Sequence, residues 1–133
     1  MQTPITTGCS AEPDNILTGN VIPLLHEIRH ALQALLDDGQ ETVIDLRSIP
    51  LGPGEEKRIT ERLGRGEVQV QLSALGPSEL VETRFPGVWL VTHSNNDGDV
   101  IGKFIEICLV PRLVSAQQAD IRAGLAELNA ALD

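Results

Sequence analysis

Aromatic and basic residues are both scarce in this 133-residue chain. It has one tryptophan, two phenylalanines and no tyrosine, and ten Lys and Arg stand against nineteen Asp and Glu, for a net charge of −9. Nucleic acids and anionic membranes are bound through basic patches, often interleaved with aromatic side chains. The sequence therefore argues against both as partners. The acidic charge either keeps the chain soluble and separate from its own copies or attracts a basic partner segment, and charge alone does not distinguish these two roles.

Cysteines are few, and long apolar runs are absent. The only cysteines are Cys9, in a polar leader, and Cys108, in an apolar segment. The N-terminus has neither the basic region nor the apolar core of a signal peptide, and no apolar stretch approaches the roughly 18 residues of a membrane-spanning helix. We therefore expect a cytoplasmic protein with two free thiols and no insertion into a membrane.

The hydrophobic period changes along the chain and predicts its organisation. Residues 1–15 have no periodicity and are expected to form a flexible leader, followed by a single domain over 16–133. Consecutive hairpins favour neighbouring antiparallel strands, with helices packed on one face. The fold class predicted is a two-layer α+β domain, with a mostly antiparallel sheet of about five strands and three helices. The helices are expected at 20–38, 53–63 and 115–132, and the strands at 42–46, 68–74, 80–84, 88–92 and 103–110.

Local signals mark several of these boundaries. Asn20 is suited to cap the first helix, and Ser115 with Gln118 fits a capping box for the last. The segment 85–88 has the Pro and Gly order of a type II turn. Hairpins define which strands are neighbours in the sheet, but they leave the position of the 42–46 strand open.

The first helix contains the string His26-Glu27-Ile28-Arg29-His30, which matches the H-E-x-x-H pattern of zinc peptidases. Two histidines one turn apart can share a zinc ion, and the glutamate between them could activate a bound water. Helical geometry, however, places both histidines opposite the apolar stripe, toward solvent. Three interpretations stay open: a zinc hydrolase, a surface metal site without catalysis, and a solvated helix face.

The strand near Cys108 offers no evident nucleophile. Alternation places Ile105, Ile107 and Leu109 on one face, and Glu106 with Cys108 on the other. No histidine partner for Cys108 is identifiable, so a small buried hydrophobic residue is the simpler interpretation. No phosphate-binding glycine loop with the required lysine is present either.

Two of the three aromatics, Phe85 and Trp89, flank the Pro86-Gly87 turn. Tryptophan is the residue type most enriched at binding hot spots, which suggests a recognition surface at this turn. The alternative is that Trp89 fills the core.

Several strings in this order resemble the conserved-region domain of the HupH/HyaF hydrogenase expression proteins. The most specific is Glu82-Thr83-Arg84-Phe85-Pro86-Gly87-Val88-Trp89; the others are Asp45-Leu46 with Pro50-Leu51, Leu63-Gly64-Arg65-Gly66-Glu67-Val68, and Ile105-Glu106-Ile107 with Val110-Pro111. Members of this family are typically longer, so we expect this chain to hold one copy of the domain.

The resemblance implies an accessory protein without catalytic activity or cofactor, which helps a nickel–iron hydrogenase to mature. Its expected client is the small-subunit precursor, with a thioredoxin-like hydrogenase accessory protein as a further candidate partner. The residues expected to contact the client are Glu67, Glu82, Thr83, Phe85, Pro86 and Trp89, with the carboxylates orienting the client and the aromatics supplying apolar contact.

Two other functions are carried as alternatives. One is a small zinc-dependent hydrolase built on His26, Glu27 and His30. The other is a structural subunit that forms homo-oligomers through a free sheet edge.

Overall fold

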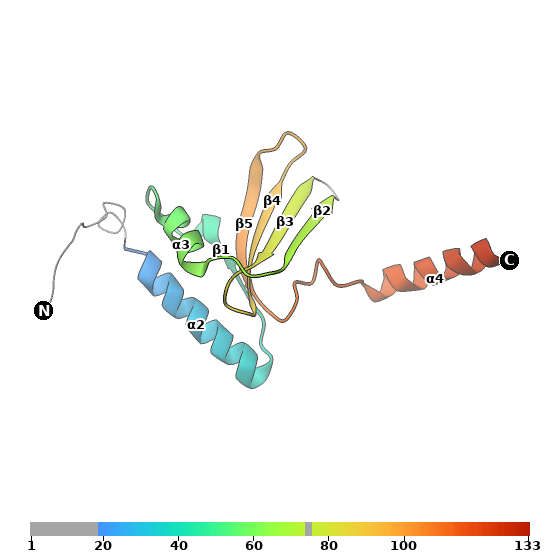
Figure 1. Ribbon diagram of the computed structural model, residues 1–133, viewed down its shortest axis with the longest axis horizontal. Helices are drawn as coiled ribbons and strands as arrows, with labels where there is room; N and C mark the ends of the chain where they lie inside the picture. The colour runs from blue at the N-terminus through green and yellow to red at the C-terminus, as the bar shows by residue number, and fades with distance from the viewer. Residues whose placement is uncertain (1–18, 74–75) are drawn as a thin grey trace, which may run out of the picture.

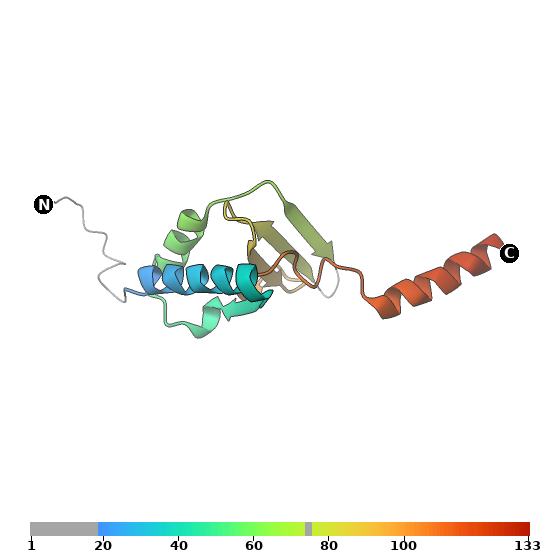
Figure 2. The same ribbon diagram turned by 90° about the horizontal axis from the view of Figure 1, so that it is seen from below.

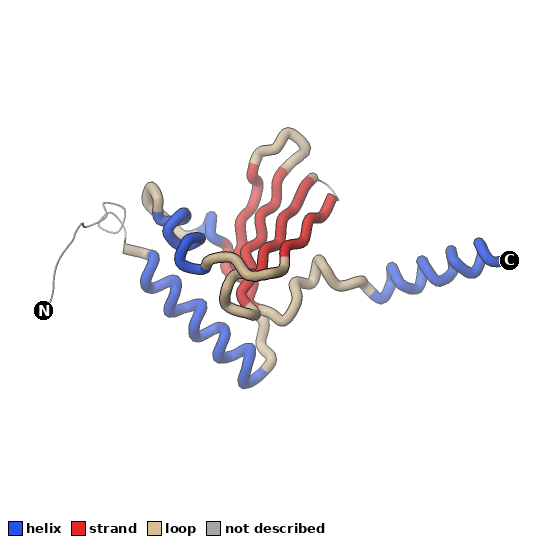
Figure 3. Tube along the Cα trace, viewed as in Figure 1, coloured by secondary structure: helices blue, strands red, loops and turns tan. Residues whose placement is uncertain are grey.

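The computed structural model describes residues 19–73 and 76–133, arranged as a five-stranded sheet with helices (Figure 1). The expected leader over residues 1–15 lies outside the described residues. The two-layer α+β fold with three helices and an antiparallel sheet is confirmed (Figure 3). The elements are α2 (Val21–Asp38), β1 (Thr42–Asp45), the 3-10 helix η1 (Leu46–Ser48), α3 (Glu55–Leu63), β2 (Gln69–Ser73), β3 (Pro77–Glu82), β4 (Val88–Ser94), β5 (Val100–Ile107) and α4 (Gln118–Leu132).

Helix α2 forms where the 3.6-residue period predicts it. It ends because Gly39 takes a positive φ of 70° and donates its backbone N–H to the Leu35 carbonyl at 3.0 Å. Asn20 precedes the helix but makes no side-chain cap. Its side chain instead donates to the Pro50 carbonyl at 3.0 Å, which ties the start of α2 to the loop before α3.

All strand pairs are antiparallel, in the order β1-β5-β4-β3-β2. The first strand therefore lies beside the last, which hairpin reasoning left open. The β2–β3 hairpin is present as predicted, with Ser73 opposite Pro77, and the turn residues 74–75 are outside the described residues. Strand β5 starts earlier than predicted and ends at Ile107. Leu109, expected on the same strand face as Ile105 and Ile107, therefore lies beyond the strand and is 80% exposed.

Each face of the sheet carries an apolar cluster. Helices α2 and α3 cover one face (Figure 2). Burying one leucine or isoleucine fully contributes ~1.5–3 kcal/mol, so this helix-covered cluster is the main source of stability. It consists of Val21, Leu24, Ile28, Ala31, Ile44, Leu46, Ile59, Leu63, Val88, Ile105 and Ile107. The opposite face carries a smaller cluster of Leu80, Trp89, Val91 and Cys108, with Val114 packed against it.

Helix α4 forms in the predicted region but does not join either layer. It extends away from the sheet and from α2 and α3 (Figures 1 and 2), and all of its residues are exposed. The predicted capping box at Ser115 is wrong, because the helix starts after Gln117 and has no side-chain cap. The Gln117 amide instead donates to the carbonyls of Arg112 and Ser115, so it holds the preceding turn. Within the described residues no helix has the length and apolarity needed to cross a bilayer.

Candidate functional site

The connection between β3 and β4 is a tight turn locked by hydrogen bonds. The Val88 N–H donates to the Phe85 carbonyl at 3.0 Å, and Gly87 has a φ of +93°, as a type II turn requires. The Phe85 N–H donates to the Thr83 hydroxyl oxygen at 3.2 Å. The Gly87 carbonyl accepts from the Cys108 N–H at 2.9 Å, which joins the turn to the end of β5. These bonds hold the turn in one conformation.

The turn also lies close against α2 and α3. Gly87 is favoured by its positive φ, and a Cβ there would in addition crowd Leu32 Cδ2 at 3.3 Å and contact Leu35 Cδ2 at 3.5 Å. The Arg84 N–H donates to the Leu63 carbonyl at the end of α3, at 3.0 Å. Three segments distant in sequence therefore meet at this point.

A groove runs between α2 and this turn. One part has a volume of about 280 Å³ and is lined by Leu25, Ile28, Arg29, Leu32, Arg62, Leu63, Arg84 and Phe85. The adjoining part has a volume of about 620 Å³ and is lined by Leu32, Leu35, Leu36, Glu82, Pro86, Gly87 and Leu109. The two parts adjoin at Leu32, which lines both, and together they are called here the α2–turn groove.

The walls of the α2–turn groove are mostly aliphatic, and some of its apolar side chains are open to solvent. Leu36 is 81% exposed, Leu109 is 80% exposed and Phe85 is 38% exposed. Large apolar side chains gathered at one surface mark sites where another protein segment is bound. The groove is therefore suited to an apolar or amphipathic segment.

Three guanidinium groups stand at one part of the groove, from Arg29, Arg62 and Arg84. The Arg84 guanidinium lies 4.9 Å from the centre of the Phe85 ring, in a cation–π contact. Among the described residues, no carboxylate lies within ion-pair distance of these three groups. This part of the groove is locally basic although the chain as a whole carries −9.

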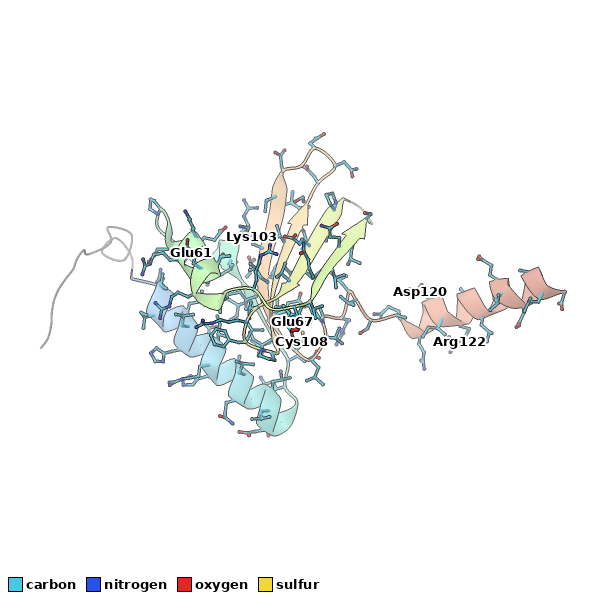
Figure 4. The ribbon with its side chains drawn as sticks, viewed as in Figure 1. Glu61, Glu67, Lys103, Cys108, Asp120 and Arg122 are labelled. Atoms are coloured by element: carbon cyan, nitrogen blue, oxygen red, sulfur yellow. The ribbon has the colours of Figure 1, made fainter. Side chains whose placement is uncertain are left out.

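The residues predicted to contact a client fall into two groups. Phe85, Pro86 and Glu82 line the α2–turn groove, and Glu67 is exposed in the segment between α3 and β2 (Figure 4). Thr83 is 2% exposed and Trp89 is 3% exposed, so neither presents a surface.

The expectation that Phe85 and Trp89 form one recognition surface is corrected by their positions. Phe85 lies against α2, whereas Trp89 belongs to the cluster on the opposite face of the sheet. The Thr83 hydroxyl holds the turn, and Trp89 fills the core beneath it, which is the alternative that the sequence left open.

Sequence reasoning missed the aliphatic wall of the groove. Strand alternation places Leu109 on one face with Ile105 and Ile107, and helical spacing places Leu36 on the apolar side of α2, but neither pattern predicts that the two side chains stay open to solvent. The only sequence sign was that the apolar stripe of α2 is wider than one buried row requires, since Leu32, Leu35 and Leu36 follow Ile28.

The H-E-x-x-H string lies on the exposed face of α2, as its spacing predicts, with His26, Glu27 and His30 all exposed. His93 lies on β4, where its Nδ1 is 2.7 Å from the Ser78 hydroxyl oxygen. In residues 19–73 and 76–133, no three potential ligands gather into a metal site. No observation of this structure favours the hydrolase.

Cys108 is buried at the end of β5 (Figure 4). Burial, together with the negative charges of Glu106 and Glu41, raises the pKa of its thiol to about 11. The pKa of Glu106 is also raised by burial and by Glu41, against the lowering effect of His93. A thiol protonated at neutral pH is a poor nucleophile, which agrees with the packing role expected for Cys108.

Comparison with known proteins gives consistent matches. The family described as "HupH hydrogenase expression protein, C-terminal conserved region" matches residues 18–133. Hydrogenase expression/formation protein HoxQ of Azotobacter vinelandii is 31% identical over 114 residues, and HupQ of Azotobacter chroococcum mcd 1 is 30% identical over 111 residues. Both alignments cover 82% of this chain and 38% of the relative, so the chain spans well under half the length of these proteins.

A solved structure has the same fold. Hydrogenase expression protein HupH from Thiobacillus denitrificans ATCC 25259 superposes with a TM-score of 0.82 at 44% sequence identity. The match covers 86% of this chain and 96% of that one.

Proposed function

Because the chain belongs to the HupH family of hydrogenase expression proteins, matching its C-terminal conserved region, we propose that it binds the precursor of the hydrogenase small subunit. In this role it is a cytoplasmic scaffold or chaperone and not a catalyst. It holds the precursor while the hydrogenase is completed. The observation that carries the proposal is the α2–turn groove, which is built around the most specific string of the family resemblance.

The groove suits an apolar segment of a client. Leu36 and Leu109 are each about four-fifths exposed, and Pro86 lines the same part of the groove. Covering such side chains contributes roughly 25 cal/mol per Å² of apolar area removed from water. An extended or helical apolar segment laid along α2 would gain this contribution over the full length of the groove.

The charges around the groove give the segment a direction. Arg29, Arg62 and Arg84 line one part, whereas Glu82 lines the other. A basic residue of the client is repelled at the arginine part and attracted toward Glu82 and the exposed Glu67. In this arrangement Phe85 and Pro86 supply apolar contact, Glu82 and Glu67 set orientation, and Thr83 and Trp89 keep the turn in place.

Co-purification tests the proposal. The tagged chain is isolated from cells that make a nickel–iron hydrogenase, and bound proteins are identified by mass spectrometry. We expect the small-subunit precursor with the unchanged chain and its loss with Leu36→Glu, which places a charge in the apolar wall. Recovery of a thioredoxin-like accessory protein in the same complex would identify it as a second partner, as the family resemblance implies.

A matched control is Ile101→Glu, because Ile101 is 61% exposed at the start of β5 and does not line the groove. It makes the same chemical change and should leave the precursor bound. Retention of the precursor by Leu36→Glu, or absence of every hydrogenase component from all samples, would contradict the proposal.

A further inference from the structure

Helix α4 has an apolar stripe with nothing packed on it. Ile121, Leu125 and Leu128 are 55–58% exposed and Leu132 is 77% exposed, at the 4-3-4 spacing of a helix-packing seam. An isolated helix of this length is marginal in water, and helices of proteins are stabilised mainly by packing an amphipathic face. We therefore expect another protein surface to pack on this stripe.

The segment before α4 fixes its direction. Pro111 is buried, and Val114 packs against the cluster that contains Trp89. The Val114 N–H donates to the Pro111 carbonyl at 2.9 Å, and the Ser115 N–H donates to the Arg112 carbonyl at 3.2 Å. Because this connector is anchored to the face opposite α2, α4 points away from the groove of its own chain (Figures 1 and 2).

The α2–turn groove matches the stripe in length. The apolar wall of α2 runs from Leu25 to Leu36, and the stripe of α4 runs from Ile121 to Leu132. Both rows span eleven residue steps, about 17 Å at 1.5 Å per residue. One helix can therefore lie along the other over its whole apolar length.

The charges are complementary as well. Helix α4 with its following residue carries the carboxylates of Asp120, Glu127 and Asp133 against the single guanidinium of Arg122. Figure 4 shows Asp120 and Arg122 on α4, far from the labelled residues of the sheet and α3. The groove contributes three of the chain's ten basic residues. An acidic helix is attracted there although two copies with a charge of −9 repel each other overall.

We propose that α4 of one copy lies in the α2–turn groove of a second copy, and that the contact is made twice around a two-fold axis. A reciprocal exchange of this kind closes into a dimer, because the stripe and the groove of each copy are both filled. The dimer itself does not depend on which client the protein binds. When the client uses the same groove, client and α4 exclude each other, and that consequence alone rests on the proposed function.

Sedimentation equilibrium of the full chain over a range of concentrations tests the dimer. Leu128→Glu disrupts the stripe, Leu36→Glu disrupts the groove, and Ile101→Glu is the matched control. All three substitutions are at exposed positions, and circular dichroism verifies the fold of each. We expect a dimer for the unchanged chain and the control, and a dimer Kd raised ~100-fold or more by either of the other variants.

Mixing the two disrupted variants identifies the exchange. The intact α4 of Leu36→Glu can still enter the intact groove of Leu128→Glu, so the mixture should form heterodimers that neither variant forms alone. A monomer at all concentrations for the unchanged chain would overturn the proposal, whether α4 is free or folds back on its own groove. So would a dimer that loses affinity with Leu128→Glu but not with Leu36→Glu, since it would pair α4 with α4.

The same variants separate this proposal from the proposed function. Leu128→Glu should abolish the dimer while the small-subunit precursor stays bound, because it leaves the groove open. Retention of the precursor by Leu36→Glu, when that variant has lost the dimer, would contradict the client proposal alone.

Discussion

Truncation of the two aromatics beside the Pro86–Gly87 turn should lower the free energy of unfolding by different amounts. Trp89 is 3% exposed and packs with Leu80, Val91 and Cys108, so Trp89→Ala leaves a large cavity in a closed cluster. Such replacements lower the free energy of unfolding by about 3–5 kcal/mol. Phe85 is 38% exposed, so Phe85→Ala removes only part of a buried ring and its contact with Arg84, and should cost less, about 1–2 kcal/mol.

The indole nitrogen of Trp89 refines this prediction. Trp89 Nε1 is buried with no hydrogen-bond partner among the described residues, and an unpaired buried donor costs ~1–3 kcal/mol. Trp89→Phe removes that donor and keeps most of the ring, so its cost should stay below about 2 kcal/mol. Trp89→Ala is therefore expected to cost the most, and Trp89→Phe and Phe85→Ala both less.

Urea unfolding monitored by far-UV circular dichroism measures these differences. Fluorescence is unsuitable for the comparison because Trp89 is the only tryptophan of the chain. Client binding is measured in parallel by co-purification, where Phe85→Ala should weaken binding and Trp89→Phe should not. A cost below about 1 kcal/mol for Trp89→Ala, together with lost client binding, would refute the assignment of Trp89 to the core and return it to the contact surface.

Two further predictions concern the turn and the end of β5. Gly87→Ala should lower the free energy of unfolding by more than Gly98→Ala. Both glycines have a positive φ (+93° and +88°), but only at Gly87 do α2 side chains lie within 4 Å of the added Cβ. Equal losses in urea unfolding would contradict the packing argument. The thiol of Cys108 ionises at a pKa of about 9 when unfolded and about 11 when folded, so the unfolded chain loses its proton first and the free energy of unfolding should fall between about pH 9 and 11. In a Cys9→Ser background, Cys108→Ala should remove that fall, and an unchanged pH profile would show that another group causes it.

Local features of the fold were predictable because they depend on contacts within a few residues. The period of α2, the positive φ of Gly39 at its end and the Pro86–Gly87 turn follow from side-chain spacing and backbone preference. The three hairpins between β2 and β5 follow for the same reason, since each joins neighbours in sequence. The amphipathic nature of α4 was also readable from its 3.6-residue period.

The partners of these elements were decided only by the tertiary structure. Antiparallel pairing of β1 with β5 joins residues 59 to 65 positions apart, from Asp45 with Phe104 to Thr42 with Ile107, which no local pattern specifies. Trp89 and Phe85 are four residues apart but lie on opposite faces of the sheet, because the turn carries Phe85 to α2 and strand alternation carries Trp89 away. Leu109 and Leu36 meet in one groove because β5 ends at Ile107 and α2 passes beside the turn.

The sequence by itself determined the fold class, the family and the chemistry of the turn. Only the tertiary structure decided which apolar side chains are covered and which stay open, because burial depends on what packs from distant parts of the chain. In the folded chain Trp89 is buried, whereas Leu36, Leu109 and the apolar stripe of α4 are exposed to solvent.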